Sequence, residues 1–252
     1  MKQFIRAIKS DIYKMVHSQV LLIHLLVPLF GMAVFLAYYT ISPWGESQKV
    51  TAYLQVLAMA FPMLIGIVTV MVSEQESQAA SCQMMLSTPS KRYIPHFAKL
   101  IVIFLFGFLS SIIAVFGFGI VFWLMGNVVF PLSLYIKLAI LLFFGNLTLY
   151  ILQYIVSFAF GKGTGLGLGI VGSLLSALLM TGLGDRVWTF LPWSIAIRFC
   201  SMFVESKVTN VSFVSLPGVT EGMMFIVLTS VIMLFILVFW STRWAGRINK
   251  DN

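Results

Sequence analysis

Six long apolar runs constrain this chain more than any other feature of its sequence. A bilayer core about 30 Å thick is crossed by about 20 residues of α-helix. Backbone polar groups inside lipid must be satisfied within the segment, so runs of this length fold as helices. The sequence therefore predicts an all-α integral membrane protein with one transmembrane domain over residues 1–252. The predicted spans are residues 20–41, 50–72, 100–125, 134–160, 164–184 and 222–240.

The charged residues are few, and their placement predicts the orientation. Only 10% of the 252 residues are charged and 60% are hydrophobic, against about 25% charged in soluble domains. The net charge of +8 does not indicate nucleic-acid binding, because Lys and Arg lie at the ends of the apolar runs. The positive-inside rule places the richer set of loops, and both termini, in the cytoplasm. That set holds Lys2, Arg6, Lys9, Lys14, Lys91, Arg92, Lys99, Lys162, Arg243, Arg247 and Lys250.

Residues 1–19 have the pattern of an amphipathic helix at the membrane surface. At 3.6 residues per turn, Lys2, Arg6, Lys9 and Lys14 share one face. Such a helix lies in the plane of the lipid headgroups. A charged flank that only orients the first span is the alternative. The opposite, apolar face carries Phe4, Ile5, Ile8, Ile12, Met15 and Val16.

The longest predicted cytoplasmic connection, residues 73–99, is expected to form a helix, a break and a second helix. The helix is expected to continue as far as Thr88, which suits an N-cap, and Pro89 suits the first turn of the next helix. This shape is typical of a segment that projects from the membrane and docks on a partner, although a solvated loop is the alternative. The residues predicted to dock or to shape the loop are Glu74, Glu76, Gln78, Gln83, Lys91 and Arg92.

A glycine-rich run favours close helix packing. Small residues spaced by four allow another helix to approach closely. The G-x-G-x-x-G pattern at 167–172 lies inside a membrane-length run without a preceding strand, so it does not indicate dinucleotide binding. No P-loop is present either, so ATP and magnesium are expected on a partner and no cofactor on this chain. The predicted packing residues are Gly161, Gly165, Gly169, Ser173 and Ala177.

The predicted external region, residues 185–221, is crowded with apolar and aromatic side chains. We expect it to be partly re-entrant or interfacial. An amphiphilic substrate could contact its aromatic residues, and simple anchoring at the interface is the alternative. The substrate-facing candidates are Trp188, Trp193, Phe199 and Phe203.

Nothing in the sequence indicates catalysis. None of the eight acidic residues lies in the middle of a predicted span, where ion-coupled carriers keep functional charges. There is no metal-ligand spacing, and Cys82 and Cys200 fall on opposite sides of the membrane. These observations favour a permease subunit driven by a separate ATPase. A membrane protein that sequesters a peptide or assists assembly, without transport, is the alternative.

The N-terminal basic helix, the six spans and the first cytoplasmic loop resemble ABC-2-type permeases. The segment from Val72 to Arg92 is similar to that of lantibiotic-immunity permeases. The resemblance implies a coupling helix between Glu74 and Ser87, two copies of a cytoplasmic ATPase and a second, related permease chain. It also implies a bacterial plasma membrane, and export of cationic lanthionine peptides for self-immunity. A drug, a lipid or a polysaccharide is the alternative cargo.

Overall fold

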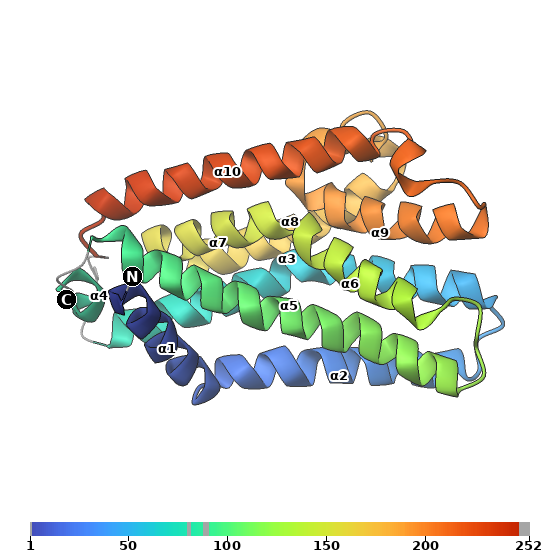
Figure 1. Ribbon diagram of the computed structural model, residues 1–252, viewed down its shortest axis with the longest axis horizontal. Helices are drawn as coiled ribbons and strands as arrows, with labels where there is room; N and C mark the ends of the chain where they lie inside the picture. The colour runs from blue at the N-terminus through green and yellow to red at the C-terminus, as the bar shows by residue number, and fades with distance from the viewer. Residues whose placement is uncertain (1, 80–81, 88–90, 247–252) are drawn as a thin grey trace.

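The computed structural model describes residues 2–79, 82–87 and 91–246, which form a bundle of α-helices (Figure 1). These residues contain no β-strand, and the prediction of an all-helical membrane fold is confirmed. The α-helices are α1 (Lys2–Val16), α2 (Gln19–Tyr39), α3 (Glu46–Gln78), α4 (Gln83–Leu86), α5 (Tyr93–Leu124), α6 (Leu132–Gly145), α7 (Leu147–Phe160), α8 (Lys162–Met180), α9 (Pro192–Val208) and α10 (Val219–Arg243). Short 3-10 helices are η1 (Gly182–Gly184), η2 (Trp188–Phe190) and η3 (Phe213–Ser215).

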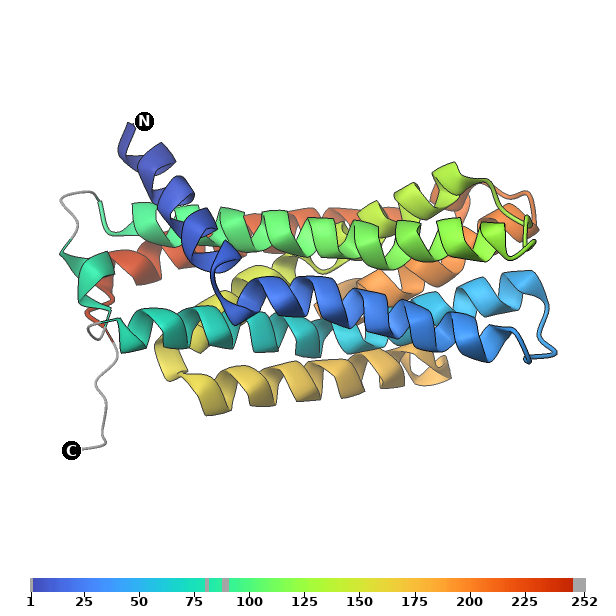
Figure 2. The same cartoon turned by 90° about the horizontal axis from the view of Figure 1, so that it is seen from below.

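Five helices, α2, α3, α5, α8 and α10, are each long and apolar enough to cross a membrane. The bent pair of α6 and α7 makes a sixth span if it is counted as one. The spans run along the long axis of the molecule (Figures 1 and 2). We call the end that carries α1 and α4 the N-terminal end, and the opposite end the far end.

Helix α1 slants away from the bundle at the N-terminal end (Figure 2). Its apolar residues Ile8, Ile12 and Met15 pack against the core, whereas Lys2 and Arg6 are exposed. The helix ends at Val16, and the N-cap of α2 follows it. The predicted N-terminal amphipathic helix is therefore confirmed, and it packs on α5 and α2.

The predicted span over 134–160 is not one continuous helix. It breaks at Asn146, and α6 and α7 meet at 41°. A Cβ atom on Gly145 would lie 2.7 Å from the Cα of Ala196, so α9 is packed against the break. The Asn146 amide donates to the Leu142 carbonyl, which satisfies one acceptor at the end of α6. The packing of α9 against this point is thus the physical reason why the predicted span is divided into two helices.

Helices α3 and α8 approach each other through small residues. A Cβ atom on Gly66 would lie 3.2 Å from the Cα of Gly169 and 3.2 Å from the carbonyl oxygen of Gly165. The Ser173 hydroxyl accepts from the backbone N–H of Met63 at 3.1 Å. Of the predicted packing residues, these three on α8 therefore lie against α3.

The other two predicted packing residues have different surroundings. Gly161 forms the turn between α7 and α8 with a φ of 85°, a conformation that favours glycine. Ala177 is half-buried on α8.

The connection between α3 and α5 breaks earlier than predicted. Helix α3 ends at Gln78, and Cys82 adopts a φ of 64° before the short α4. The next spanning helix begins at Tyr93. Thr88 and Pro89, the predicted start of that helix, lie outside the described residues.

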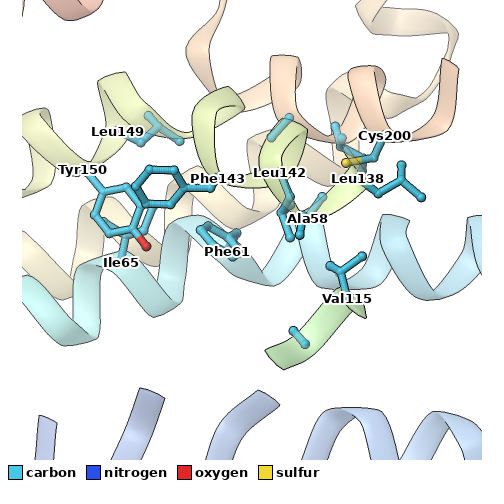
Figure 3. Close-up of a cluster of buried hydrophobic side chains, with 14 of the residues drawn as sticks. Ala58, Phe61, Ile65, Val115, Leu138, Leu142, Phe143, Leu149, Tyr150 and Cys200 are labelled. Atoms are coloured by element: carbon cyan, nitrogen blue, oxygen red, sulfur yellow. The ribbon is translucent and has the colours of Figure 1, made fainter. Parts of the chain in front are cut away.

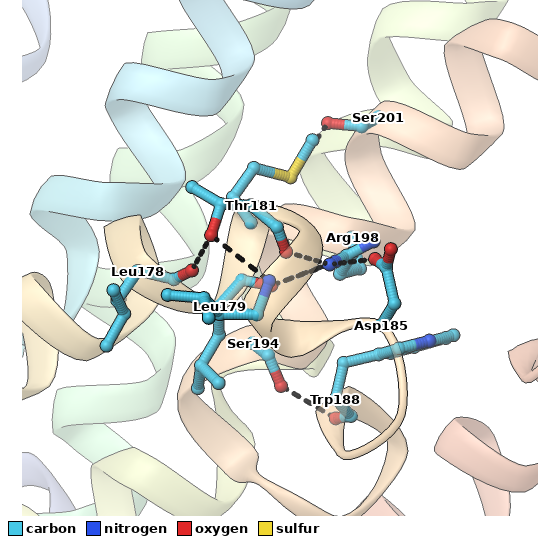
Figure 4. A network of polar contacts seen from close by, with 10 residues as sticks. Leu178, Leu179, Thr181, Asp185, Trp188, Ser194, Arg198 and Ser201 are labelled. Carbon is cyan, nitrogen blue, oxygen red and sulfur yellow. Dashed lines mark hydrogen bonds and ion pairs between the residues drawn. The ribbon is translucent and has the colours of Figure 1, made fainter.

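Helix α9 lies inside the far half of the bundle, packed against α3, α6 and α8 (Figure 1). Arg198 on α9 binds the end of α8, because its guanidinium donates to the carbonyl oxygens of Leu179 and Thr181 (Figure 4). It also forms an ion pair with Asp185 at 2.8 Å. The end of a helix leaves carbonyl groups without partners, and here an arginine from α9 satisfies two acceptors near it.

Candidate functional site

Four charged side chains form a buried cluster at the N-terminal end, which we call the ionic junction: Asp11, Lys14, Glu76 and Lys99. The Lys99 ammonium on α5 lies 2.6 Å from Asp11 Oδ1 on α1 and 2.9 Å from Glu76 Oε1 on α3. Lys14, one turn beyond Asp11, donates to the same Glu76 oxygen at 2.8 Å. Two cations and two carboxylates thus join three helices.

The ionic junction is largely removed from solvent. The side chains of Lys99, Asp11 and Glu76 are 5%, 9% and 1% exposed, whereas that of Lys14 is 30% exposed. Buried charges are costly unless they are paired, and here each charge contacts a charge of opposite sign. Burial raises the pKa of the Asp11 carboxyl above its ordinary value, and the nearby Lys99 opposes that shift. The pairing therefore fixes α1, α3 and α5 in one arrangement.

One oxygen of the junction has no hydrogen-bond partner. Glu76 Oε2 is buried and receives no hydrogen bond from the described part of the chain. An unsatisfied buried acceptor costs about 1–3 kcal/mol.

The ionic junction lies directly beside the break that precedes α4. The backbone N–H of Cys82 donates to the Glu76 carbonyl at 3.0 Å. The same residue that binds both lysines therefore also binds Cys82, the residue directly before α4. Glu76 thus connects the segment before α4 to α3 through its backbone carbonyl, and to α1 and α5 through its carboxylate.

The predicted docking residues divide into exposed and buried groups. Glu76 is almost fully buried, so it positions other groups and presents no surface to a partner. Glu74 is half-buried. Arg92 Nη1 donates to the Trp244 carbonyl at 3.2 Å, which joins the start of α5 to the end of α10. The exposed members of the predicted set are Gln78, Gln83, Lys91 and Arg92.

His96 extends this packed end of the molecule to α7 and α10. Its Nδ1 lies 2.9 Å from the Tyr154 hydroxyl, and the ring is 2% exposed. The aromatic rings of Phe158, Trp240 and Trp244 surround it at centroid distances of 5.1–5.6 Å. The helices that leave the ionic junction are therefore held to the rest of the bundle by aromatic packing.

Sequence analysis missed the roles of Asp11, Lys14 and Lys99. Lys14 and Lys99 counted there only as charges that orient the spans. A signal for Asp11 was present, because it lies on the apolar side of the first helix, three residues from Ile8 and four from Met15. A carboxylate on an apolar face indicates a buried cationic partner.

The predicted substrate-facing residues are mostly buried within the chain. Trp188, Phe199 and Phe203 are 6%, 3% and 9% exposed, and Phe213 packs against both phenylalanines. Trp193 is half-buried on α9, and its Nε1 has no partner among the described residues. Their placement supports a packing role for the region and gives no support to direct substrate contact.

A groove lined by both polar and apolar side chains, the far-end groove, opens at the far end instead, between α3 and α9. It has a volume of about 640 Å³ and is lined by Trp44, Gln55, Ser201 and Glu205, among others. Gln55 donates to the Ser201 hydroxyl across it at 3.2 Å. The exposed Trp44 and Glu205 offer an aromatic face and a carboxylate. Among the residues that the structure describes, no group of three or more His, Cys, Asp and Glu could hold a metal ion.

Comparison with known proteins gives one family. The model of the ABC-2 family transporter protein matches residues 7–176, which is more than half of the chain. The match includes all four members of the ionic junction and ends within α8. A search of curated proteins returned no match.

Proposed function

Because this chain belongs to the ABC-2 transporter family and is a membrane subunit of an ABC transporter, we propose that a separate ATPase drives it through α4 and the ionic junction. The ionic junction is the observation that carries this proposal. It is the place where the short helix α4, which exposes Gln83, is joined through Glu76 to α1, α3 and α5.

The proposed mechanism is a rigid-body movement. Two copies of a cytoplasmic ATPase would contact the exposed residues Gln78, Gln83 and Lys91 and close when ATP binds. Because Lys99 fixes both Asp11 and Glu76, α1, α3 and α5 would tilt together when α4 is displaced. A second, related permease chain would complete the pathway, and the N-terminal end would face the cytoplasm.

We further propose that the cargo is a cationic amphiphilic peptide of the lantibiotic class, removed from the outer face of a bacterial membrane. The far-end groove supports this cargo. Its carboxylate at Glu205 suits an ammonium group, the ring of Trp44 suits apolar side chains, and Gln55 offers an amide for hydrogen bonding. Among the described residues, no Lys or Arg lines this groove, which makes it less suited to a phosphate-rich lipid.

Affinity purification from the native membrane tests the ATPase partner. The wild-type chain should enrich an ABC ATPase, and Gln83→Arg, which places a cation at the exposed first residue of α4, should reduce that enrichment about tenfold. Thr220→Arg is the matched control, because Thr220 is exposed at the far end. Equal enrichment with both variants would contradict docking at α4.

Peptide resistance tests the cargo. Glu205→Gln should lower resistance to a cationic lanthionine peptide and leave enrichment of the ATPase unchanged. The matched control is Glu221→Gln, which alters another exposed carboxylate at the far end, outside the groove. Unchanged resistance in the groove variant would count against a peptide cargo and favour a drug, a lipid or a polysaccharide.

A further inference from the structure

An apolar crevice lies between α2, α3 and α5, away from both the ionic junction and the far-end groove. It consists of two adjoining cavities of about 160 Å³ and 40 Å³. We call it the α2 crevice. The residues that line both cavities are Val27, Pro28, Phe61, Leu64 and Ser110.

The crevice exists because α2 packs mainly on α5 and much less on α3. Gly31 on α2 faces the larger cavity, and a Cβ atom added there would meet nothing within 4 Å. Val27 and Val56 on its walls are 39% and 45% exposed. Since these helices are membrane spans, the crevice is open to the lipid that surrounds them.

Three polar groups line the smaller cavity without using their full hydrogen-bonding capacity. His24 is 6% exposed, and its Nδ1 lies 2.7 Å from the Val20 carbonyl. Because a carbonyl only accepts, Nδ1 carries the proton, and Nε2 of the neutral ring is left as an acceptor. The hydroxyl groups of Ser110 and Tyr150 have no hydrogen-bond partner among the described residues, and Tyr150 is 3% exposed.

Tyr150 reaches this cavity through close packing with α5. Gly107 has no side chain, and a Cβ atom there would overlap the Tyr150 hydroxyl. Figure 3 shows the Tyr150 ring beside that of Phe143, with the ring centroids 5.6 Å apart. Because Tyr150 lines the smaller cavity, a ligand bound there can supply a hydrogen-bond partner for its hydroxyl.

We propose that the α2 crevice binds a neutral, hydroxyl-bearing lipid with a single alkyl chain, such as a monoacylglycerol. The alkyl chain occupies the larger, apolar cavity. The polar end lies in the smaller cavity, where its hydroxyl donates to His24 Nε2 and its oxygens accept from Ser110 and Tyr150.

Size and charge select this chemical class. A dry apolar cavity of about 150 Å³ holds one benzene molecule, so the larger cavity holds about six carbons, and the rest of the chain stays in the bilayer. In the part of the chain that the structure describes, no Asp, Glu, Lys or Arg lines either cavity. A phosphate headgroup would be desolvated there without a counter-charge, which is strongly unfavourable.

Photolabelling in lipid nanodiscs tests the proposal. Nanodiscs of phosphatidylcholine would contain the full chain and a trace of monoacylglycerol with a diazirine on its alkyl chain. Labelled residues mapped by mass spectrometry should include Leu64 or Phe61, and excess unlabelled monoacylglycerol should compete. Labelling of these residues that does not saturate, or that a diazirine phosphatidylcholine gives equally, would overturn the proposal.

Filling the crevice provides the matched comparison. Gly31→Leu should reduce labelling of the crevice about tenfold, because the new side chain takes the space of the alkyl chain. Gly167→Leu is the control, since a Cβ atom there also meets nothing within 4 Å but faces away from the crevice. Equal labelling in the two variants would overturn the proposal. Ala60→Leu, which alters another lining residue, gives the same comparison if Gly31→Leu does not fold.

The polar end is tested separately. Replacing Ser110 with Ala together with Tyr150 with Phe removes both hydroxyl donors and should weaken labelling by the monoacylglycerol about tenfold. Labelling by a diazirine alkane, which has no hydroxyl group, should stay unchanged. An equal loss for both probes would overturn the assignment of the polar end.

Discussion

The Lys99 ammonium lies 2.6 Å from the Asp11 carboxylate across the contact between α5 and α1, and both side chains are buried. Eighty-eight residues separate them in sequence. This pair, shared with Glu76, fixes the amphipathic N-terminal helix to the spanning bundle.

Loss of Lys99 should destabilise the fold strongly. Lys99→Met leaves Asp11 and Glu76 as two buried carboxylates with only Lys14 between them, and breaking a buried pair costs about 3–5 kcal/mol. We expect a lower Tm in detergent and loss of the contact between α1 and α5. Lys9→Met, a change at an exposed position of α1, should leave the Tm unchanged. A Tm for Lys99→Met equal to that of the Lys9 variant would contradict the structural role of the junction.

A neutral residue in place of Glu76 should leave assembly with the ATPase intact but weaken its coupling to transport. Glu76→Gln keeps the side-chain shape and an oxygen near both lysines but removes the charge, which lowers the strength of each bond by about 1–2 kcal/mol. We expect the ATPase to co-purify at the wild-type level and transport-linked ATP hydrolysis to fall about tenfold. Wild-type hydrolysis in this variant would show that the junction does not transmit movement from α4.

Close contact between α3 and α8 should limit substitution at Gly169. A Cβ atom there would lie 3.2 Å from the Cα of Met63 and from the Pro62 carbonyl oxygen, both backbone atoms. Gly169→Ala should therefore cost about 1–3 kcal/mol through overpacking. Gly167→Ala, on the same helix with open space around it, should not. Thermal unfolding of the two variants compares them directly.

The amphipathic helix, the spans and the small-residue run are features that sequence predicts well, because each depends on residues close together in the chain. The ionic junction is different, since residues 11, 76 and 99 meet only after α1, α3 and α5 have packed. The break at Asn146 also depends on a distant residue, because it is Ala196 on α9 that lies against Gly145. Hydropathy alone therefore predicts one continuous helix there.

The break before α4 is another feature that the local sequence does not predict. The residues from Gln78 to Gln83 contain no Pro or Gly, so local propensity favours a continuing helix. The chain nevertheless turns at Cys82, in the left-handed region, where its N–H reaches the Glu76 carbonyl. Such a conformation is rare for residues other than Gly, Asn and Asp, and no local sequence pattern predicts it.

Arg198 should control the order of the segment between α8 and α9. Its guanidinium donates through Nε and Nη2 to the Leu179 carbonyl, at 3.1 and 2.8 Å, and also to the carbonyl of Thr181 (Figure 4). Lysine presents one point charge and cannot reproduce this fork of donors. Arg198→Lys should therefore raise amide hydrogen exchange over residues 179–187 about tenfold.

The exposed neighbour Arg186 provides the matched control for this change. Arg186→Lys keeps all contacts of Arg198 and should leave exchange over the same residues unchanged. Since Arg198 holds α9 against the end of α8, faster exchange in the Arg198 variant should extend to the first turn of α9 and no further. Exchange that stays at the wild-type level in the Arg198 variant would mean that the 3-10 turns of the segment order it without the arginine, and an equal rise in both variants would mean that the effect is not specific to Arg198.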